Sequence, residues 1–529
     1  MNNWKKFFTQ PPTKYILWFL IIVSMYCLFL SIYLLRTQTP RLLIKADSQP
    51  AAQADGKVYY VSTTGSNNNP GTMAAPWKTI QYGVDQLAAG DTLLVRGGFY
   101  DECRIEPRNH GEEGKWITVK NYPGETPVLD KQRAYCKNDF GDVACNTQKG
   151  CFGFFHGVPG SPSSQTDKGS YYEISGFKIR NFWFSAIACW NTHHVKVTNN
   201  IVEYAGSSAI AGLRHGCNNM IIENNIVRYT GQTQNGIPGR GWGSGISLNY
   251  QSNPFPWENN GRFHNIIRNN IVYGSYDPGE YAEHSEGSGI VTDLGEAIPP
   301  TLIENNLIFN NGRNCLYTYQ NHNVWIVGNT CFKNCQDTTY GNCSQDWVAE
   351  LYLATNQPAN VVILDNIIYA DKAYGLTGVH NNDISGYNLF FGGRGQTGSI
   401  GRNSITGHDP KFSNININCG PQTYSNPQGI CASDNPQDFR AYFGLKADGP
   451  ATDKIAETAA SYSGPGGSTQ HLAQSDINGL NRPAGAGYDI GAFEYSSNTA
   501  LPSITPSPTV PVPTLGPANA LPQFNRTYY

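Results

Sequence analysis

Residues 277–293 hold a concentration of groups that bind cations or transfer protons. The segment contains five carboxylates and one histidine, among them Glu283, His284, Glu286 and Asp293. Oxygen-rich clusters of this kind bind Ca²⁺, which makes Glu283, Glu286 and Asp293 candidate metal ligands. A pair of carboxylates can instead hydrolyse a glycosidic bond that lies between them. The third interpretation is an acidic loop that only contacts solvent.

The elements that must position this segment are repeated along the chain. A corner residue recurs at intervals of 22 to 45 residues and opens a short, β-branched strand. These corner residues are Asn200, Asn225, Asn270, Asn306, Asn329, Asn366 and Asn388. An apolar marker alternates with them, at Ile187, Ile210, Ile246, Ile290, Leu316, Leu351 and Leu376. Repeats of this length indicate stacked coils, and alternation without a helical period indicates strands.

The two interleaved repeats predict an all-β, single-stranded parallel β-helix with regular coils over residues 171–390. We expect the corner asparagines to suit a left-handed turn and to stack on one another as an amide ladder. The alternative is a β-sandwich in which the repeats are coincidental. Three long loops, at 231–241, 277–287 and 335–347, would leave the same corner of the coil.

The repeat resembles that of the right-handed parallel β-helix superfamily typified by pectate lyases. The resemblance implies that the strands with the apolar marker form the first sheet, which lines a ligand cleft together with its flanking loops. Residues 59–100, which include YYVSTTGSNNNPG and PWKTI, resemble the opening of family 9 polysaccharide lyases. Residues 488–495, with the sequence YDIGAFEY, are similar to the choice-of-anchor Q segment. Neither stretch carries catalytic residues.

We place the β-helix domain at residues 57–495. Its predicted parts are an N-terminal cap with the first coils (57–130), the regular coils, and a C-terminal cap (391–495). A helix with Ile80 and Val84 on its apolar face would cover the open N-terminal end, because a solenoid needs its end covered.

Side chains of the predicted first sheet alternate between the inside and the outside of the coil. The first and third residues after each marker therefore point outward, which places Asn249, Asp293 and Tyr319 in one column. Exposed tyrosine and tryptophan suit the flat C–H faces of sugars, although surface strands favour tyrosine in any case. The predicted substrate-binding residues are Trp190, His215, Asn249, Tyr250, Tyr317, Tyr319 and Tyr352.

The resemblance also implies a chemistry, because enzymes of that superfamily often bind a uronate through Ca²⁺ and use lysine or arginine as the base. Elimination from a uronate needs a base for the C5 proton and a cation that neutralises the carboxylate. No lysine occurs between Lys196 and Lys333. The predicted catalytic residues are Arg214 or His284 as the base, together with Asp293.

Composition limits the functional class. The chain of 529 residues has a net charge of −3 and a pI of about 6.4, so it lacks the basic footprint of a nucleic-acid-binding protein. Thirteen cysteines favour disulfides and an oxidising compartment, with buried free thiols as the alternative. Close-spaced candidates are Cys419/Cys431, Cys335/Cys343 and the group Cys136, Cys145 and Cys151.

The ends of the chain predict attachment to a membrane. Residues 15–35 form an uncharged run long enough to cross a bilayer, between a cytoplasmic tail (1–14) and a polar tether (36–56). The run is longer than the apolar region of a cleaved signal peptide, which favours a signal anchor. We therefore predict a single-pass membrane protein whose bulk is extracellular, on a bacterial cell surface. Residues 496–529 form a proline-rich tail.

Two functions fit these observations. The first is a membrane-anchored extracellular monomer that binds an acidic, uronate-containing polysaccharide and cleaves it as a lyase, with glycoside hydrolysis as the second choice and Ca²⁺ as the cofactor. The second is a non-catalytic surface or adhesion protein in which the β-helix is a rod.

Overall fold

The structure is a computed structural model. It describes residues 56–131, 152–158, 166–213, 217–232, 234, 236, 239–249, 260–278, 284, 286–293, 298–337, 348–354, 360–380, 383–420 and 426–497. The predicted membrane span at 15–35 and nearly all of the tether and the proline-rich tail lie outside these residues. No helix within the described ranges is long and apolar enough to cross a membrane.

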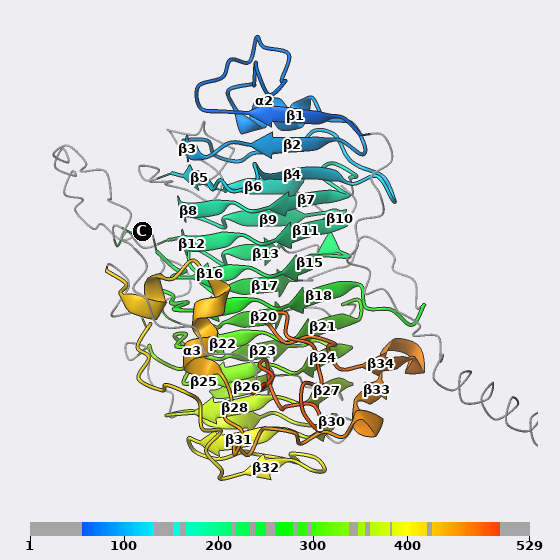
Figure 1. Ribbon diagram of the computed structural model, residues 1–529, viewed down its shortest axis with the longest axis vertical. Helices are drawn as coiled ribbons and strands as arrows, with labels where there is room; N and C mark the ends of the chain where they lie inside the picture. The colour runs from blue at the N-terminus through cyan, green and yellow to red at the C-terminus, as the bar shows by residue number, and fades with distance from the viewer. Residues whose placement is uncertain are drawn as a thin grey trace, which may run out of the picture. The chain divides into compact units, whose positions relative to one another are not determined.

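Three large sheets of parallel strands run along the molecule (Figure 1). The first sheet contains β6 (Phe154–Gly157), β9 (Ile187–Trp190), β13 (Ile210–Gly212), β17 (Ile246–Asn249), β20 (Ile290–Asp293), β23 (Leu316–Tyr319), β26 (Ala349–Ala354) and β29 (Tyr374–Thr377). The second contains β1 (Val58–Val61), β2 (Thr92–Val95), β4 (Ile117–Asn121), β7 (Tyr172–Ser175), β11 (Val195–Thr198), β15 (Ile221–Glu223), β18 (Asn265–Arg268), β21 (Thr301–Glu304), β24 (Val324–Val327), β27 (Val361–Leu364) and β30 (Ile384–Gly386). The third contains β3 (Gly98–Tyr100), β5 (Pro127–Asp130), β8 (Lys178–Phe182), β12 (Ile201–Ala205), β16 (Ile226–Arg228), β19 (Ile271–Tyr273), β22 (Leu307–Phe309), β25 (Thr330–Phe332), β28 (Ile367–Ala370), β31 (Leu389–Gly392) and β32 (Ile405–Thr406).

The remaining elements are short. They are the pair β10 (Thr192–His193) and β14 (Cys217–Asn218), the antiparallel pair β33 (Ser461–Ser463) and β34 (Thr469–His471), the helices α2 (Ile80–Asp85) and α3 (Arg440–Phe443), and the 3-10 turns η2 (Gly429–Ala432), η3 (Pro436–Phe439), η4 (Glu457–Ala459) and η5 (Pro465–Gly467). Helix α2 occupies the stretch in which the sequence predicts a helix, and it contacts β1 and β2. The Thr79 hydroxyl accepts from the Tyr82 amide and so begins it.

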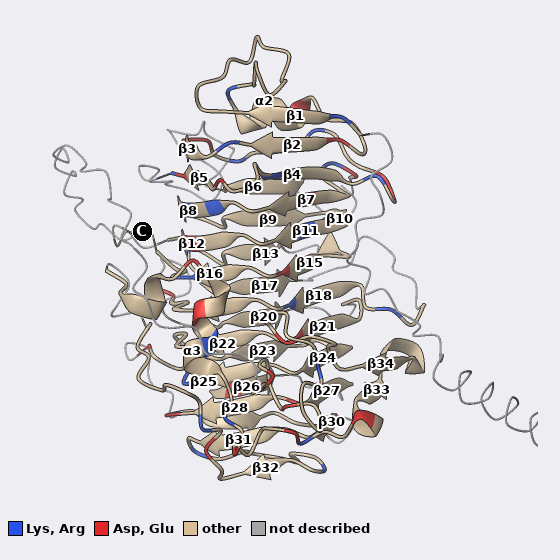
Figure 2. Ribbon diagram, viewed as in Figure 1, with Lys and Arg blue, Asp and Glu red and all other residues tan. Residues whose placement is uncertain are grey.

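The chain visits the first, second and third sheets in turn, which confirms the predicted parallel β-helix. The predicted register is also confirmed, because the seven apolar markers are neighbours on successive strands of the first sheet. Marker side chains such as Ile210 and Ile290 are fully buried in the core inside the coil. Most residues in the strands are neither basic (Lys, Arg) nor acidic (Asp, Glu) (Figure 2). This is expected for strands that are packed on one or both faces.

The corner asparagines form the predicted amide ladder. The Asn225 side-chain amide donates to Asn270 Oδ1 at 2.9 Å, and that of Asn270 donates to Asn306 Oδ1 at 3.0 Å. The left-handed turn is made by the residue before the ladder, such as Asn224 (φ 59°) and Asn269 (φ 56°). The sequence analysis assigned both the left-handed turn and the ladder to one asparagine. In the structure, the first residue of each consecutive pair makes the turn and the second forms the ladder.

A second ladder, which the sequence did not reveal, lies between the third sheet and the first. The Ser275 amide donates to Asn311 Oδ1 at 2.9 Å, and the Asn311 side chain donates to Asn334 Oδ1 at 2.8 Å. The ladder ends at Glu350, whose Oε2 accepts from the Asn334 amide at 2.7 Å. Burial is the main cause that raises the pKa of Glu350 to about 8, so this carboxyl group carries a proton at neutral pH.

The C-terminal segment, residues 408–420 and 426–497, lies against the outer face of the third sheet. Tyr229 and Tyr273 both donate hydroxyl hydrogen bonds to the Cys431 carbonyl at 3.0 Å. Helix α3 is drawn next to the label of β22 in Figure 1, and the ring of Phe309 on β22 packs against Phe443 in α3. Residues 391–407 do continue the coil through β32. The expected C-terminal cap thus lies along the side of the coils and not only across their end.

An ionic cluster also joins this segment to the solenoid. Arg228 contacts Glu203 and Asp434, each at 2.6 Å, and donates to the Ser433 carbonyl at 2.7 Å. Burial alone would raise the pKa of Glu203. Arg228, together with the neighbouring basic residues Lys178 and Arg180, outweighs burial and lowers the pKa to about 2.

Three disulfides are present within the described residues. Cys419–Cys431 confirms one predicted pair. Cys189–Cys217 joins two successive coils, whereas Cys315–Cys331 joins the start of β23 to β25 within a single turn, and neither pair was predicted. Cys335 is disulfide-bonded, whereas Cys343 and the group Cys136, Cys145 and Cys151 lie outside the described residues.

Candidate functional site

The predicted column on the outer face of the first sheet exists. Asn249, Asp293 and Tyr319 are register partners on β17, β20 and β23. The Asn249 side-chain amide donates to Asp293 Oδ2 at 3.3 Å. Its carbonyl oxygen is buried and accepts no hydrogen bond from the residues that the structure describes. A buried acceptor without a donor is a place where a ligand hydroxyl gains a hydrogen bond at no competing cost.

Tyrosine rings continue this face on the following coils. Tyr317 on β23 and Tyr352 on β26 stack with centroids 5.4 Å apart and an interplanar angle of 10°. Tyr319 lies with its ring centroid 6.1 Å from that of Tyr317. All three rings are half-buried. The three predicted tyrosines therefore form one aromatic patch beside Asp293.

Glu286 lies at the edge of this face, four residues before the marker Ile290. Burial is the largest cause that raises its pKa, and Asp293 and Asp277 add to the effect. Arg313 opposes them, and Ser244 donates a hydrogen bond to the carboxyl group. The net pKa is about 7, so Glu286 exchanges a proton near neutral pH, as a catalytic acid or base must.

Arg313 was missed by the sequence reasoning, although it supplies the positive charge of the site. It lies three residues before the marker Leu316, on the coil after Glu286, and its amide donates to the Gly287 carbonyl at 3.1 Å. Arg313 lowers the pKa of Glu286, whereas burial, Glu286 and Asp293 raise the pKa of Tyr317. The signal was available, because aligning the residues before each marker brings Arg313 next to Glu286.

His284 is held in place by a residue that the sequence did not suggest. Its Nδ1 lies 2.7 Å from Asp337 Oδ2, and its ring meets Tyr276 edge-on at 5.2 Å. A carboxylate at Nδ1 keeps the proton there, which leaves Nε2 as the acceptor. The amide of His284 donates to the Asp277 carbonyl at 2.8 Å, so the histidine and Glu286 share Asp277 as a neighbour.

One predicted residue is in the expected place but not in the expected environment. Trp190 ends β9, yet only 7% of its surface is exposed. It packs with Phe152, Phe155 and Trp183 in a separate apolar cluster outside the coil, so its expected role as an open sugar platform is not supported by its exposure. Sequence alternation gives the direction of a side chain but not what covers it. The predicted residues Arg214, His215, Tyr250 and Glu283 lie outside the described residues.

The described donors do not by themselves form the predicted calcium site. In the described part of the chain, one set of three candidate ligands lies within 4.8 Å, namely Cys315, Cys331 and Glu350, and its two cysteines are joined as a disulfide. Glu286 and Asp293 share their surroundings with the guanidinium of Arg313, whose positive charge does part of what a metal would do.

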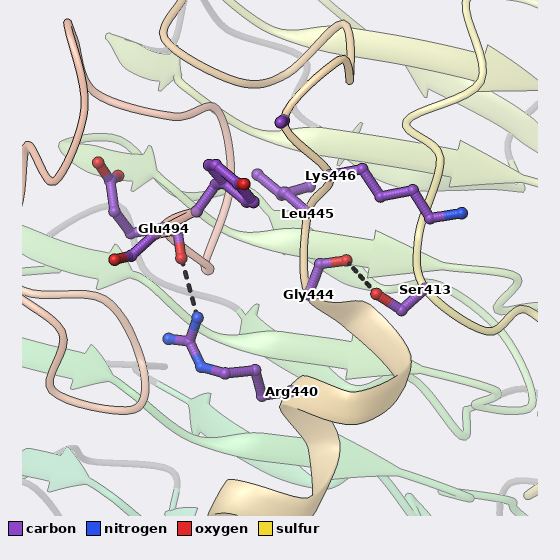
Figure 3. A pocket seen from close by; sticks show the side chains of 9 residues that line it. Ser413, Arg440, Gly444, Leu445, Lys446 and Glu494 are labelled. Carbon is purple, nitrogen blue, oxygen red and sulfur yellow. Dashed lines mark hydrogen bonds between the residues drawn. The ribbon is translucent and has the colours of Figure 1, made fainter. Parts of the chain in front are cut away.

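A separate cavity of about 380 Å³ lies within the C-terminal segment (Figure 3). Arg440 faces it but donates to the Glu494 carbonyl at 2.9 Å and is paired with Asp476. Ser413 donates to the Gly444 carbonyl across the same cavity. These polar groups satisfy one another and hold the segment together, so the outer face of the first sheet remains the candidate site.

Comparison with known proteins found relatives that match a short part of the chain. The uncharacterized protein YwoF of Bacillus subtilis is 36% identical over 77 residues, which cover 15% of this chain and 16% of that protein. Pectate lyase PEL9 of Emericella nidulans is 38% identical over 72 residues, which cover 13% of this chain and 18% of that protein. The chain therefore matches less than a fifth of the length of either relative.

The solved structure of pectate lyase Pel9A aligns with 83% of this chain and 97% of its own, at 14% identity and a TM-score of 0.46. A family model described as "Pel9A-like, right handed beta helix region" matches residues 59–356, which is more than half of the chain. That range includes most strands of the three sheets, the asparagine ladder as far as Asn329 and the site around Glu286, and the chain belongs to this Pel9A-like right-handed β-helix family.

Proposed function

We propose that the protein binds an acidic polysaccharide across the outer face of the first sheet and cleaves it by β-elimination at Glu286. The observation that carries the proposal is a carboxyl group with a pKa of about 7 placed beside Arg313 and next to Asp293 and the tyrosine patch. The class of substrate is suggested by the relative PEL9, which is named as a pectate lyase, and by membership of the Pel9A-like family.

Each step of the elimination has a residue at the site. Arg313 pairs with the uronate carboxylate and stabilises the charge that develops when the C5 proton leaves. His284 Nε2 accepts that proton, with Asp337 keeping the other ring nitrogen protonated. The electron pair of the C5–H bond forms the C4–C5 double bond, and the C4–O bond breaks. Protonated Glu286 donates its proton to the leaving oxygen.

Hydrolysis is the second candidate, and the coupling of Glu286 to Asp293 favours it. Asp293 contributes to the raised pKa of Glu286, and two carboxyl groups with separated protonation states are the pattern of a glycosidase. In that reaction Glu286 protonates the glycosidic oxygen and Asp293 acts as the base or nucleophile. The substrate and the binding face are the same in both mechanisms.

An assay of two products separates the mechanisms. Polygalacturonate, alginate and hyaluronate are each incubated with the whole protein, with and without a calcium chelator. Ultraviolet absorbance of unsaturated ends supports elimination, whereas new reducing ends without that absorbance support hydrolysis. Loss of either product in Glu286→Gln supports the assigned site. Binding without any product would overturn cleavage and favour the adhesion alternative. Dependence on calcium would show that residues beyond the described ones, such as Glu283, complete a metal site.

We also propose that the protein is anchored in the cell membrane through residues 15–35, with the β-helix outside. The uncharged run and the disulfides support this placement, since disulfides persist in oxidising compartments. Extraction of the whole protein into a soluble fraction by alkaline carbonate would overturn the anchor. Protection of the β-helix from external protease in intact cells would overturn the orientation.

A further inference from the structure

We propose that Trp242 forms a sugar-binding subsite one coil before Glu286 and takes a pyranose ring of the acidic polysaccharide. This inference rests on the proposed function, because the ring would belong to the same polymer that Glu286 cleaves. It adds a binding position on the side of the site opposite to the tyrosine patch.

The position of Trp242 follows from the register of the coils. Trp242 lies four residues before the marker Ile246, and Glu286 lies four residues before Ile290. The two markers are partners on β17 and β20, and neighbouring strands are about 4.8 Å apart. Ser244, two residues after Trp242, donates a hydrogen bond to the Glu286 carboxyl group. Trp242 therefore occupies the same edge of the first sheet as Glu286, one coil earlier.

The ring of Trp242 is presented on a fixed backbone. Its carbonyl accepts from Ser208 Oγ at 2.8 Å and from the Ser244 amide at 2.9 Å. The residue has φ 57°, a left-handed conformation that costs about 1 kcal/mol in a residue other than glycine. A pinned backbone reduces the entropy that is lost when a ligand binds.

The exposure of Trp242 is unusual for so large an apolar side chain. Its surface is 44% exposed, and the Arg240 guanidinium lies over the ring with its carbon 4.6 Å from the centroid. Arg240 thus covers one face of the indole, and the cation–π contact fixes its orientation. The other exposed large apolar side chains in the described ranges are Val58, Met73, Phe99, Ile384 and Ile415, and none of these five lies on a coil of the first sheet beside Glu286.

An indole with one face held by a cation and much of its surface open is suited to a sugar ring. The axial C–H groups of a pyranose pack on an aromatic face, and the positive charge of Arg240 behind the ring attracts an anionic sugar. On the other side of Glu286, Arg313 and the Tyr317 patch take the following sugar units. The polymer then crosses successive coils, with the bond to be cleaved next to Glu286.

The test is the affinity of the whole protein for polygalacturonate, alginate and hyaluronate, with xylan as the neutral comparison, measured by calorimetry. We expect Trp242→Ala to weaken binding of the acidic polymer by about tenfold or more and Trp242→Phe to restore most of it. Trp242→Gly relieves the left-handed backbone and is expected to weaken binding equally. Phe99→Ala, a matched exposed aromatic on the third sheet, is expected to leave affinity unchanged.

The kinetic signature is a raised KM with a nearly unchanged kcat, because Trp242 contacts a sugar away from the bond that breaks. The inference is overturned if the wild type binds an acidic polymer and both Trp242→Ala and Trp242→Gly bind it equally well. Failure of the wild type to bind any acidic polymer overturns the proposed function together with this subsite. Binding that is lost in Trp242→Ala but without turnover supports the subsite and rejects only the cleavage.

Discussion

Glu286 connects the protonation of a single side chain to both stability and catalysis. Its pKa is raised from 4.5 to about 7, so between these pH values the folded protein holds a proton that the unfolded chain has released. The free energy of unfolding therefore falls as pH rises through this range, and the loss is complete above about pH 7. The acid form needed for protonating the leaving oxygen is lost as pH rises past about 7.

We predict that cleavage falls as pH rises above about 7, and that Glu286→Gln lowers kcat by about 100-fold or more. The variant should also unfold with a flatter pH dependence between pH 5 and 8, because it removes the titrating group. A pH–rate profile and denaturant unfolding at both pH values measure these effects. An unchanged kcat in Glu286→Gln would assign the acid to another residue.

Glu350 gives a second prediction at the scale of one residue. Its raised pKa of about 8 means that deprotonation above that pH places a charge in the buried second ladder. Glu350→Gln keeps an oxygen for one of the two Asn334 donors and carries no charge at any pH, so it should lose less stability than the wild type between pH 6 and pH 9. Glu350→Ala should be less stable by about 1–3 kcal/mol, since those donors lose their acceptor. Thermal unfolding at pH 6 and 9 tests both variants. An equal loss of stability between these pH values in the wild type and in Glu350→Gln would contradict the raised pKa of Glu350.

Residue by residue, the sequence predicted the site unevenly. Asp293 and Tyr317 follow from alternation along strands whose register is fixed, whereas Glu286 was found as a member of the acidic segment 277–293 and predicted to be a metal ligand. Arg313 could have been found by aligning the residues before each marker. Asp337 lies beyond the end of β25, where no period indicates direction, and only the fold brings it to His284. Trp190 shows the opposite failure, because its direction was predictable while the aromatic cluster that covers it was not.

At the scale of elements, the asparagine ladder sets the register of neighbouring coils. The Asn270 side-chain amide donates to the Ile222 and Arg268 carbonyls as well as to Asn306, and its oxygen accepts from Asn225. Asn270→Ala removes all of these bonds and leaves buried partners unsatisfied.

We therefore expect Asn270→Ala to lower the free energy of unfolding by about 2–4 kcal/mol. Asn68→Ala is the matched control, since Asn68 is exposed in a loop, and its change should stay within about 0.5 kcal/mol. Denaturant unfolding measures both. Similar values for the two variants would show that the ladder does not stabilise the coils.

The strands and corners were predicted better than the individual site residues. The reason is that the corner asparagines and the apolar markers alternate regularly and together define each turn of the coil. The second ladder escaped notice because its members are not all of one type: a serine begins it, a glutamate ends it, and only Asn311 and Asn334 are alike. The members of this ladder are related by the hydrogen bonds that they form with one another and not by their residue type. Sequence periodicity detects repeated residue types more readily than repeated hydrogen bonds.

At the scale of the whole molecule, the C-terminal segment depends on the cluster around Glu203. The pKa of Glu203 is lowered from 4.5 to about 2, so its contribution to stability is present above about pH 4.5 and is lost as pH falls toward about 2. Below that range Arg228 keeps its charge without its buried carboxylate partner. Nothing in the sequence indicated which sheet this segment would cover, because its contacts join residues more than 200 positions apart.

We predict that residues 426–497 exchange amide hydrogens faster at pH 3 than at pH 6, after correction for the intrinsic pH dependence, while the first sheet stays protected. Arg228→Leu should loosen the same residues at pH 6, because it removes the nearest cation of buried Glu203 together with the contacts to Asp434 and the Ser433 carbonyl. Asp448→Asn, which removes the exposed pair with Lys411, serves as the control and should have no effect. Uniform exchange across both regions would contradict this division.

The matched register of the coils has a consequence for how proteins of this family diversify. Duplication or loss of one complete coil would leave every ladder bond and every marker contact with a neighbour of the same kind. It would nevertheless shift an aromatic platform by one step relative to the reactive carboxyl group. Such a change alters the length of polymer that the protein binds and leaves the reacting residues unchanged.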